Sequence, residues 1–504
     1  MIMRRVKTKY DLNLLLGIAN ILICGLCIFL YNIMDDSGLV NIFTIVLVGL
    51  FAIENVGMLS YEKRRRNPFI IILVLVVTVF YMTRVASILH IPASASLWGR
   101  TLIPSATELN YALIFILLSN AAMFAGFYLA GKYNENRKKI LCEGGSFPQM
   151  KNAIIIIALV VLVSFFDVLN FELLGRFTGY IKVFLNRNTI FLFTFTMLAY
   201  HYNKTSLRNR MLFIVIISLI VILITLSGSR SGVLSVGMVL LMGILAVKQK
   251  IMFSKKVILV SLVIIPISVI IFATATLKQH LGIKDTITIE HLKIAKESQV
   301  LDYDHIIGYL PLIYYRLGFL EFSTELIANR QKFAQIINGQ YYAESIVDNV
   351  LTPGFDIFGT PKVSHALSYI RRNEPVPDID QIMQAYQSDQ LGIYGEYYVF
   401  FNGYSALAVF FFLAFIYQVI YANLQTTVGL LTCIYRAVLL NLFYIWLNSF
   451  GMDWFAFDLI VAVITTFLFA RFYVSDGKRK SILMLESKKN MGAQMIPSIE
   501  RCRR

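Results

Sequence analysis

Charged residues are scarce in this chain. Asp, Glu, Lys and Arg make up only 15% of its 504 residues, whereas apolar residues account for 57%. The mean hydropathy of the chain is +0.68. A soluble domain cannot bury that much apolar surface, so the composition excludes an ordinary globular protein and predicts an all-α polytopic membrane protein.

Cysteine and the common cofactor motifs are also rare or missing. None of the five cysteines lies between residues 278 and 393, so that segment folds without a disulfide. Cys24 and Cys27 form a C-x-x-C inside an apolar run, where we expect helix residues rather than a redox or metal pair. The sequence has no H-E-x-x-H, paired C-x-x-C, Walker or Rossmann pattern. We therefore expect no metal, no cofactor and no ATP hydrolysis.

Long apolar runs fill most of the chain. A spanning helix needs about 20 mostly apolar residues, and about twelve runs approach that length. The sixth, seventh and eighth are short and one could be re-entrant, so we expect about 11 to 13 spans. The expected spans are 11–33, 39–60, 68–89, 107–130, 151–170, 188–202, 211–227, 231–247, 256–277, 394–420, 430–450 and 455–473.

The net charge is +16, and the distribution of the basic residues along the chain indicates the membrane topology. The alternate linkers and both tails hold 29 of the 46 lysines and arginines, as the positive-inside rule predicts for cytoplasmic segments. We therefore place both termini in the cytoplasm and expect no nucleic-acid partner. The first run is long enough to remain as an anchor rather than a cleaved signal peptide.

A long polar segment interrupts the apolar runs. Residues 278–393 contain 10 basic and 14 acidic residues, which lack the cytoplasmic bias, so we predict a large extracytoplasmic loop. Helical spacing of apolar residues at 287–300 and 321–338 predicts short helices folded over the membrane core. The chain thus divides into nine helices in 1–277, the loop, three helices in 394–474 and a basic cytoplasmic tail at 475–504.

An arginine stands in a Gly- and Ser-rich turn at the outer end of the seventh run. Ser229 and Arg230 lie in the stretch Leu226–Gly232, between two apolar runs. An arginine there is costly unless it faces a cavity or a partner. Turn backbone N–H groups and a guanidinium together suit an anionic group such as a phosphate. The alternative is an arginine that snorkels at a helical hairpin.

Further candidate residues lie in the loop. Arg316 follows Tyr315, so a guanidinium could grip a phosphate while tyrosine rings stack on sugars. Its alternative role is an ion pair with Glu321 or Glu325. His365 could act as a general base or a hydrogen-bond donor, although a lone loop histidine is more often solvated.

The remaining loop features are two arginines and two acidic pairs. Arg371 and Arg372 follow His365 closely and add positive charge. Two D-x-D patterns occur, at 302–304 and 378–380. They resemble metal–nucleotide sites, but nucleotide sugars are not expected outside the cytoplasm, so we interpret both as chance.

The tenth run opens with an acidic residue. Glu396 lies in Gly395–Tyr404 at the membrane boundary. It could stabilise a helix N-terminus, bind sugar or act as a base. Asp453 and Asp458 flank the turn before the last run, where Trp454 could anchor the interface.

The order of three features in this chain resembles that of Wzy-type O-antigen and repeat-unit polymerases. The features are the turn at 227–232, Arg316 with the stretch 353–362, and the start of the tenth run at 395–404. The resemblance implies a GT-C-like glycosyltransferase in the bacterial inner membrane that uses polyprenyl-diphosphate-linked oligosaccharides. Arg230 and Arg316 would hold diphosphates, and His365 or Glu396 would act on the acceptor hydroxyl. A chain-length regulator is a further implied partner. An O-antigen ligase, a related transferase with lipid-linked donors, or a lipid-linked oligosaccharide flippase stays open. A flippase would be expected to carry charges inside its spans and to have short outer loops.

Overall fold

The fold is that of a computed structural model. It describes residues 9–33, 40–90, 105–135, 142–143, 187–202, 230–248, 252–254, 319–351, 357–371, 375–376, 392–425, 427–448, 451–453 and 455–467.

The described part of the chain is a helical bundle. Six of its helical segments are long and apolar enough to cross a membrane, as expected for a polytopic membrane protein. These are α1 (Leu12–Ile33), α2 (Ile42–Arg65), α3 (Pro68–Val77) with its continuation, α5 (Ala106–Glu135), α21 (Ala406–Leu424) and α22 (Leu430–Leu447). Large apolar side chains are exposed along α1, α2, α5 and α21, as expected for surfaces that face lipid. The count of twelve spans stays a prediction, because 151–170, 211–227 and 256–277 lie outside the described residues.

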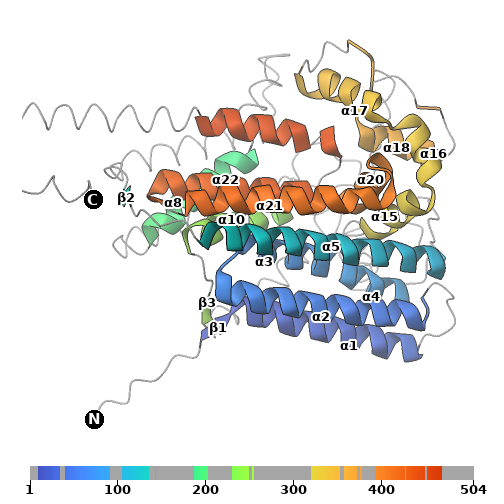
Figure 1. Cartoon of the computed structure of the whole chain (residues 1–504), viewed down its shortest axis with the longest axis horizontal. Coiled ribbons are helices and arrows are strands. Elements are labelled where there is room, and N and C mark those ends of the chain that lie inside the picture. The colour runs from blue at the N-terminus through green and yellow to red at the C-terminus, as the bar shows by residue number, and fades with distance from the viewer. Residues whose placement is uncertain are drawn as a thin grey trace, which may run out of the picture.

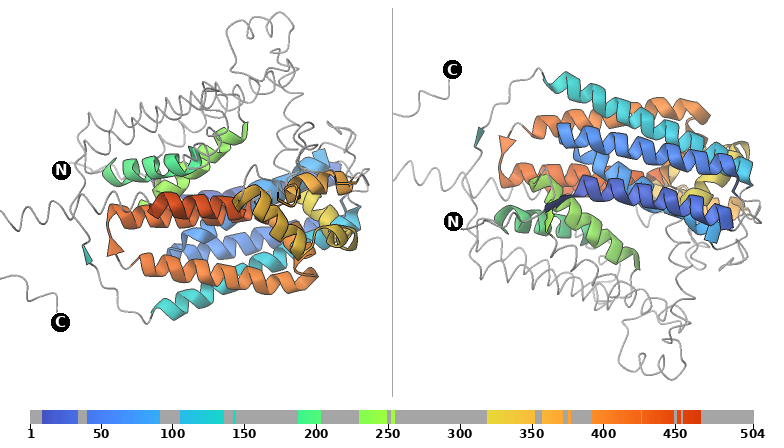
Figure 2. Two further views of the ribbon diagram at one scale, coloured as in Figure 1. Left: turned by 90° about the horizontal axis from the view of Figure 1, so that it is seen from above. Right: turned by 90° about the horizontal axis from the view of Figure 1, so that it is seen from below.

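The helices of the bundle run side by side (Figure 1). Two shorter helices, α8 (Arg187–Tyr202) and α10 (Arg230–Val247), pack against α22 and lie to one side of the bundle (Figure 2). A last apolar helix covers Phe455–Phe467. The opposite end from the loop helices carries two short sheets. In these, β1 (Lys9–Asp11) pairs with β3 (Met252–Ser254), and β2 (Cys142–Glu143) pairs with β4 (Thr427–Val428).

Local sequence explains how the second and third runs separate. Asn41 caps α2 by accepting a hydrogen bond from the Thr44 N–H. The helix ends at Arg66, whose φ of 56° is left-handed. Asn67 then caps α3, which starts at Pro68, a residue favoured at the first helical position. Only Arg66 and Asn67 therefore separate α2 from α3, which makes the connection a tight turn.

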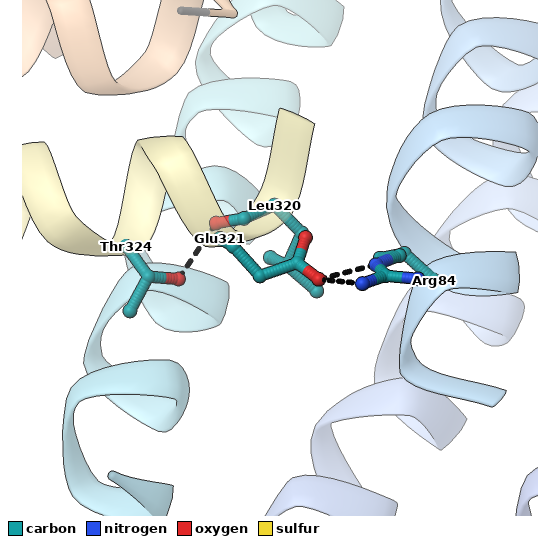
Figure 3. A network of polar contacts seen from close by, with 4 residues as sticks. All are labelled: Arg84, Leu320, Glu321 and Thr324. Atoms are coloured by element: carbon teal, nitrogen blue, oxygen red, sulfur yellow. Dashed lines mark hydrogen bonds and ion pairs between the residues drawn. The ribbon is translucent and has the colours of Figure 1, made fainter. Parts of the chain in front are cut away.

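The third span contains a π-helical turn. The π turn η1 (Thr78–Met82) links α3 to α4 (Thr83–His90), so one continuous helical segment covers 68–90, close to the predicted 68–89. A π turn inserts one residue and shifts the face on which later side chains lie. Arg84, just past this turn, is 7% exposed and forms an ion pair with Glu321 of α15 (Phe319–Ala328), as Figure 3 shows.

The tenth run is not one helix, which corrects the predicted span at 394–420. Helix α20 (Ile393–Phe400) ends at a reversal where Asn402 and Gly403 have φ of 59° and 83°. The turn η4 (Gly403–Ser405) then leads into α21. Rings of Tyr394 and Phe410 lie 5.7 Å apart, so α20 folds back beside α21 and its first residues enter the bundle. The break is a local backbone event that hydropathy does not register.

Four described helices of the loop cover this end of the bundle (Figure 1). They are α15, α16 (Arg330–Ile336), α17 (Gly339–Ile346) and α18 (Val363–Arg371). Of the two predicted loop helices, 321–338 corresponds to α15 and α16, and 287–300 lies outside the described residues. Phe319, Leu320 and Ile327 join the core of the spans. A second small core is formed by Leu326, Phe333, Ile337, Tyr342, Val363, Ala366, Leu367, Ile370 and Val399. The loop helices are therefore anchored to the bundle by apolar packing.

Candidate functional site

Only some of the predicted site residues fall in the described part of the chain. Arg230 is the first residue of α10 and Arg371 is the last residue of α18. Ser229, Tyr315, Arg316 and Arg372 lie outside the described residues, as do both D-x-D patterns. The predicted grouping of arginines therefore stays a prediction. The structure describes both His365 and Glu396.

Glu396 lies at the junction of three segments. Its carboxyl is 2% exposed, and Oε1 accepts hydrogen bonds of 2.7 Å from the Tyr342 hydroxyl and from the Met452 N–H. Its Oε2 is buried and has no hydrogen-bond partner among the described residues. This arrangement ties α17 and the turn at 451–453 to α20. In this conformation the side chain connects three segments through its two hydrogen bonds.

The surroundings of Glu396 change its proton affinity. Burial raises the pKa of the carboxyl to about 7, and the nearby charge of Asp453 adds to the increase. The hydrogen bonds from Tyr342 and Met452 act in the opposite direction. A carboxyl whose pKa lies near the working pH can both take up and release a proton. Glu396 therefore has the proton affinity that a general base needs, although its Oε1 is occupied by the Tyr342 hydroxyl.

His365 has the opposite character. Its side chain is 4% exposed on α18, so the alternative that it is a solvated loop residue is wrong. Burial, followed by the charge of Lys362, lowers the pKa of the imidazole to about 4. The ring is thus neutral at pH 7 and a weak base. Between the two predicted catalytic residues, the local chemistry favours Glu396.

Asp453 is the third ionisable group at this junction, and no sequence pattern marked it as a site residue. It is fully buried, and its Oδ2 accepts hydrogen bonds from the Ser345 hydroxyl at 2.9 Å and the Val363 N–H at 3.0 Å. Val363 starts α18, so this carboxylate caps a helix N-terminus. Gly451 permits the approach, because a Cβ there would lie 2.6 Å from Asp453 Oδ1.

Lys362 lies beside the same carboxylate. Burial lowers the pKa of its ammonium group, while the charges of Asp453 and Asp458 oppose that change. Lys362, Asp453, His365 and Glu396 therefore form a buried ionisable cluster between the loop helices and the bundle. The spacing of Lys362, Glu396 and Asp453 along the chain did not indicate that these residues lie close together in the fold. Within the described ranges, no three His, Cys, Asp or Glu side chains come together as metal ligands.

A second polar group lies deeper, inside the spans. The Tyr394 hydroxyl donates a 2.6 Å hydrogen bond to Asn120 Oδ1 of α5. Glu54 of α2 lies close to Asn120, and its Oε2 is buried without a hydrogen-bond partner in the part of the chain that is described. Nearby, Asn20 Oδ1 accepts hydrogen bonds from Asn55 and Thr78. Ionisable and amide groups in a span are costly, so they point to a functional or packing role.

Comparison of the chain with protein families, with curated proteins and with solved structures finds no match in any of the three.

Proposed function

We propose that this chain is a membrane glycosyltransferase that polymerises lipid-linked repeat units of a bacterial surface polysaccharide. In this proposal it has about twelve spans and a GT-C-like fold in the inner membrane. Both termini are cytoplasmic and the loop 278–393 is periplasmic. The growing glycan moves from one polyprenyl diphosphate onto the terminal sugar of another lipid-linked unit.

The observation that carries the proposal is the buried ionisable cluster between the loop helices and α20. Both substrates would be anchored in the outer leaflet with their sugars outside, so the reaction needs a site where spans meet an outer cover. The described loop helices cover one end of the bundle, which supports this arrangement. The cluster gives that boundary a carboxyl with a pKa of about 7.

The proposed step uses few groups. The acceptor hydroxyl oxygen attacks the anomeric carbon of the donor sugar and forms the new C–O bond. The bond from that carbon to the diphosphate breaks, and the leaving group takes the electron pair. Glu396 receives the hydroxyl proton once the Tyr342 hydroxyl has moved aside. Arg230 and Arg316 stabilise the diphosphate charge, supported by Ser229, Tyr315, Arg371 and Arg372. Holding two anchored substrates in register supplies further acceleration.

Glu54 supports a second candidate, a lipid-linked oligosaccharide flippase. Its carboxyl lies inside a spanning helix beside Asn120, and charges within the spans are what a transporter would be expected to have. The polymerase remains the better candidate, because a large outer loop that packs on the bundle has no evident use in moving a lipid across the membrane.

The test is a complementation experiment. In a strain that lacks this gene, the wild-type protein should restore long polysaccharide ladders on gels. Arg230→Ala and Glu396→Gln should insert normally but leave single-repeat products. Normal ladders from the Arg230→Ala protein would contradict the proposal. Loss of every capped product, including single repeats, would favour the flippase or a ligase.

Purified protein separates the candidates directly. With lipid-linked repeat units as the only substrates, a polymerase elongates glycan on the carrier. A ligase transfers glycan to a lipid A core, and a flippase moves the lipid between leaflets without forming a bond. Glu54→Gln should leave elongation unchanged if the polymerase assignment is right, and should abolish movement if the flippase assignment is right.

A further inference from the structure

A cluster of aromatic rings lies where the first turns of α5 meet α20 and η4. Tyr111, Tyr398 and Tyr404 have ring centroids 6.0 to 6.2 Å apart, and Phe115 packs against two of them. The Tyr111 and Tyr398 hydroxyl oxygens are 2.8 Å apart. Tyr111 is 39% exposed and Tyr404 is 42% exposed. Tyr111 and Tyr404 thus present phenol groups at the surface, and the largely buried Tyr398, which is 7% exposed, lies in contact with both.

Arg330 brings a positive charge to this cluster. Its Nη1 lies 3.2 Å from the point where a Cβ on Gly403 would stand, and the Tyr398 hydroxyl lies 3.7 Å from the same point. The charge acts on both the Tyr111 and Tyr398 phenols. Over the described ranges, no carboxylate forms an ion pair with Arg330. A half-buried guanidinium therefore stands beside hydroxyl groups without a neutralising partner there.

An apolar face continues from the cluster along the bundle. On α21 the exposed side chains Phe412, Ile416 and Ile420 recur every four residues, so they share one face of the helix. Helices α5 and α21 lie side by side (Figure 1), and α5 adds Leu118 and Leu129 to the exposed apolar surface. A hydrocarbon chain along this face would bring its headgroup to the tyrosines.

We propose that Arg330 and the hydroxyls of Tyr111, Tyr398 and Tyr404 bind the phosphate headgroup of a membrane-anchored lipid. The guanidinium supplies charge and a two-pronged donor, and the phenols donate further hydrogen bonds to phosphate oxygens. An aromatic interface belt would account for the tyrosines alone. Such a belt does not account for the Arg330 guanidinium, which lies next to the tyrosines where the chain reverses at Gly403. The inference stands on this geometry and does not require polymerase activity.

The test measures headgroup binding by the full-length protein in phosphatidylcholine nanodiscs. The probe is farnesyl diphosphate, with farnesol as the matched lipid that lacks the phosphates. We expect the wild type to prefer the diphosphate. Arg330→Gln should weaken its binding about tenfold or more, the usual size of a lost charge-assisted hydrogen bond. Arg330→Lys keeps the charge and should lose less.

Lys332 provides the matched control. It lies on the same helix, and its Nζ is 5.8 Å from the Phe333 ring. Lys332→Gln removes the same charge and should leave binding unchanged. The conservative change Tyr404→Phe keeps the ring and should weaken the diphosphate about twofold to tenfold. Because Arg330→Lys and Tyr404→Phe preserve charge or shape, they separate a lost site from a misfolded protein.

Two outcomes would overturn the inference. One is equal affinity of wild type and Arg330→Gln for farnesyl diphosphate. The other is equal loss from Arg330→Gln and Lys332→Gln, which would show a general charge effect. Competition by phosphatidylglycerol at equal mole fraction would support the site and assign it to bulk anionic lipid. Weak competition would assign it to prenyl diphosphates. Binding is measured without turnover, so its failure alongside normal polysaccharide ladders would leave the proposed function intact.

Discussion

The Tyr342 hydroxyl donates a 2.7 Å hydrogen bond to Oε1 of Glu396. This contact joins α17, one of the loop helices that cover the bundle, to α20. Both side chains are buried, so neither is exposed to bulk solvent in this conformation. A substrate hydroxyl that bonded to Oε1 would have to replace Tyr342 there, whereas Oε2 is buried and has no hydrogen-bond partner among the described residues. The same contact therefore holds the cover in place and occupies one of the two oxygens of the candidate base.

We predict that Glu396 makes stability fall as pH rises. Burial raises its pKa from 4.5 to about 7, so the folded protein holds a proton that the unfolded chain releases. The contribution is full below about pH 4.5 and is lost by about pH 7, a change of about 3 kcal/mol. The melting temperature of Glu396→Gln minus that of the wild type should increase over this range.

The difference between variants is the right quantity, because His365 titrates in the opposite sense. Burial lowers its pKa from 6.5 to about 4, so its contribution to stability increases between those pH values. Glu344→Gln makes the same chemical change on α17 and serves as the matched control variant. A pH-independent difference between wild type and Glu396→Gln would refute the assignment.

The buried Arg84–Glu321 pair should be strongly coupled. The two side chains are 8% and 11% exposed, and burial raises the pKa of Glu321 while the charge of Arg84 opposes the increase. Removing one partner leaves an uncompensated buried charge, which costs about 3 to 5 kcal/mol. Arg84→Met should lower the melting temperature markedly, and adding Glu321→Leu should restore most of it. Additive losses in this double-mutant cycle would show that the two residues do not interact.

Gly126 should be needed for the contact between α5 and α21. A Cβ at this position would lie 2.4 Å from the Phe411 carbonyl oxygen, so Gly126→Ala forces two packed helices apart. We expect a loss of about 1 to 3 kcal/mol in thermal unfolding. Gly49→Ala is the control, since nothing lies within 4 Å of its Cβ position. That change should be neutral or stabilising, because alanine favours helix.

Asp453 should hold the start of α18. Asp453→Asn keeps an oxygen that can accept from Ser345 and Val363 but removes the charge at the helix N-terminus, which costs about 0.3 to 2 kcal/mol. Asp453→Ala removes the acceptor as well and should cost more. Limited proteolysis within residues 357–371 reports on this local change. Equal cleavage rates for wild type and Asp453→Ala would contradict the capping role.

The positions of several helices could be read from composition and spacing. The predicted spans 11–33 and 68–89 agree closely with α1 and the 68–90 segment, since a continuous apolar run has one favourable conformation in lipid. The break at Asn402 was missed, because two backbone angles reverse the chain without altering hydropathy. Arg84 was missed as a partner of Glu321, because 237 residues separate them.

The amino-acid sequence by itself determined that this is a helical membrane protein, because the apolar content leaves no other way to satisfy both side chains and backbone. It also identified Glu396 and His365 as residues of interest. Only the tertiary structure decided their character. The two sit in one buried cluster, yet burial raises the pKa of the carboxyl and lowers that of the imidazole, since a low-dielectric environment disfavours whichever form carries charge. That environment is assembled from three separate segments of the chain, which no local pattern specifies.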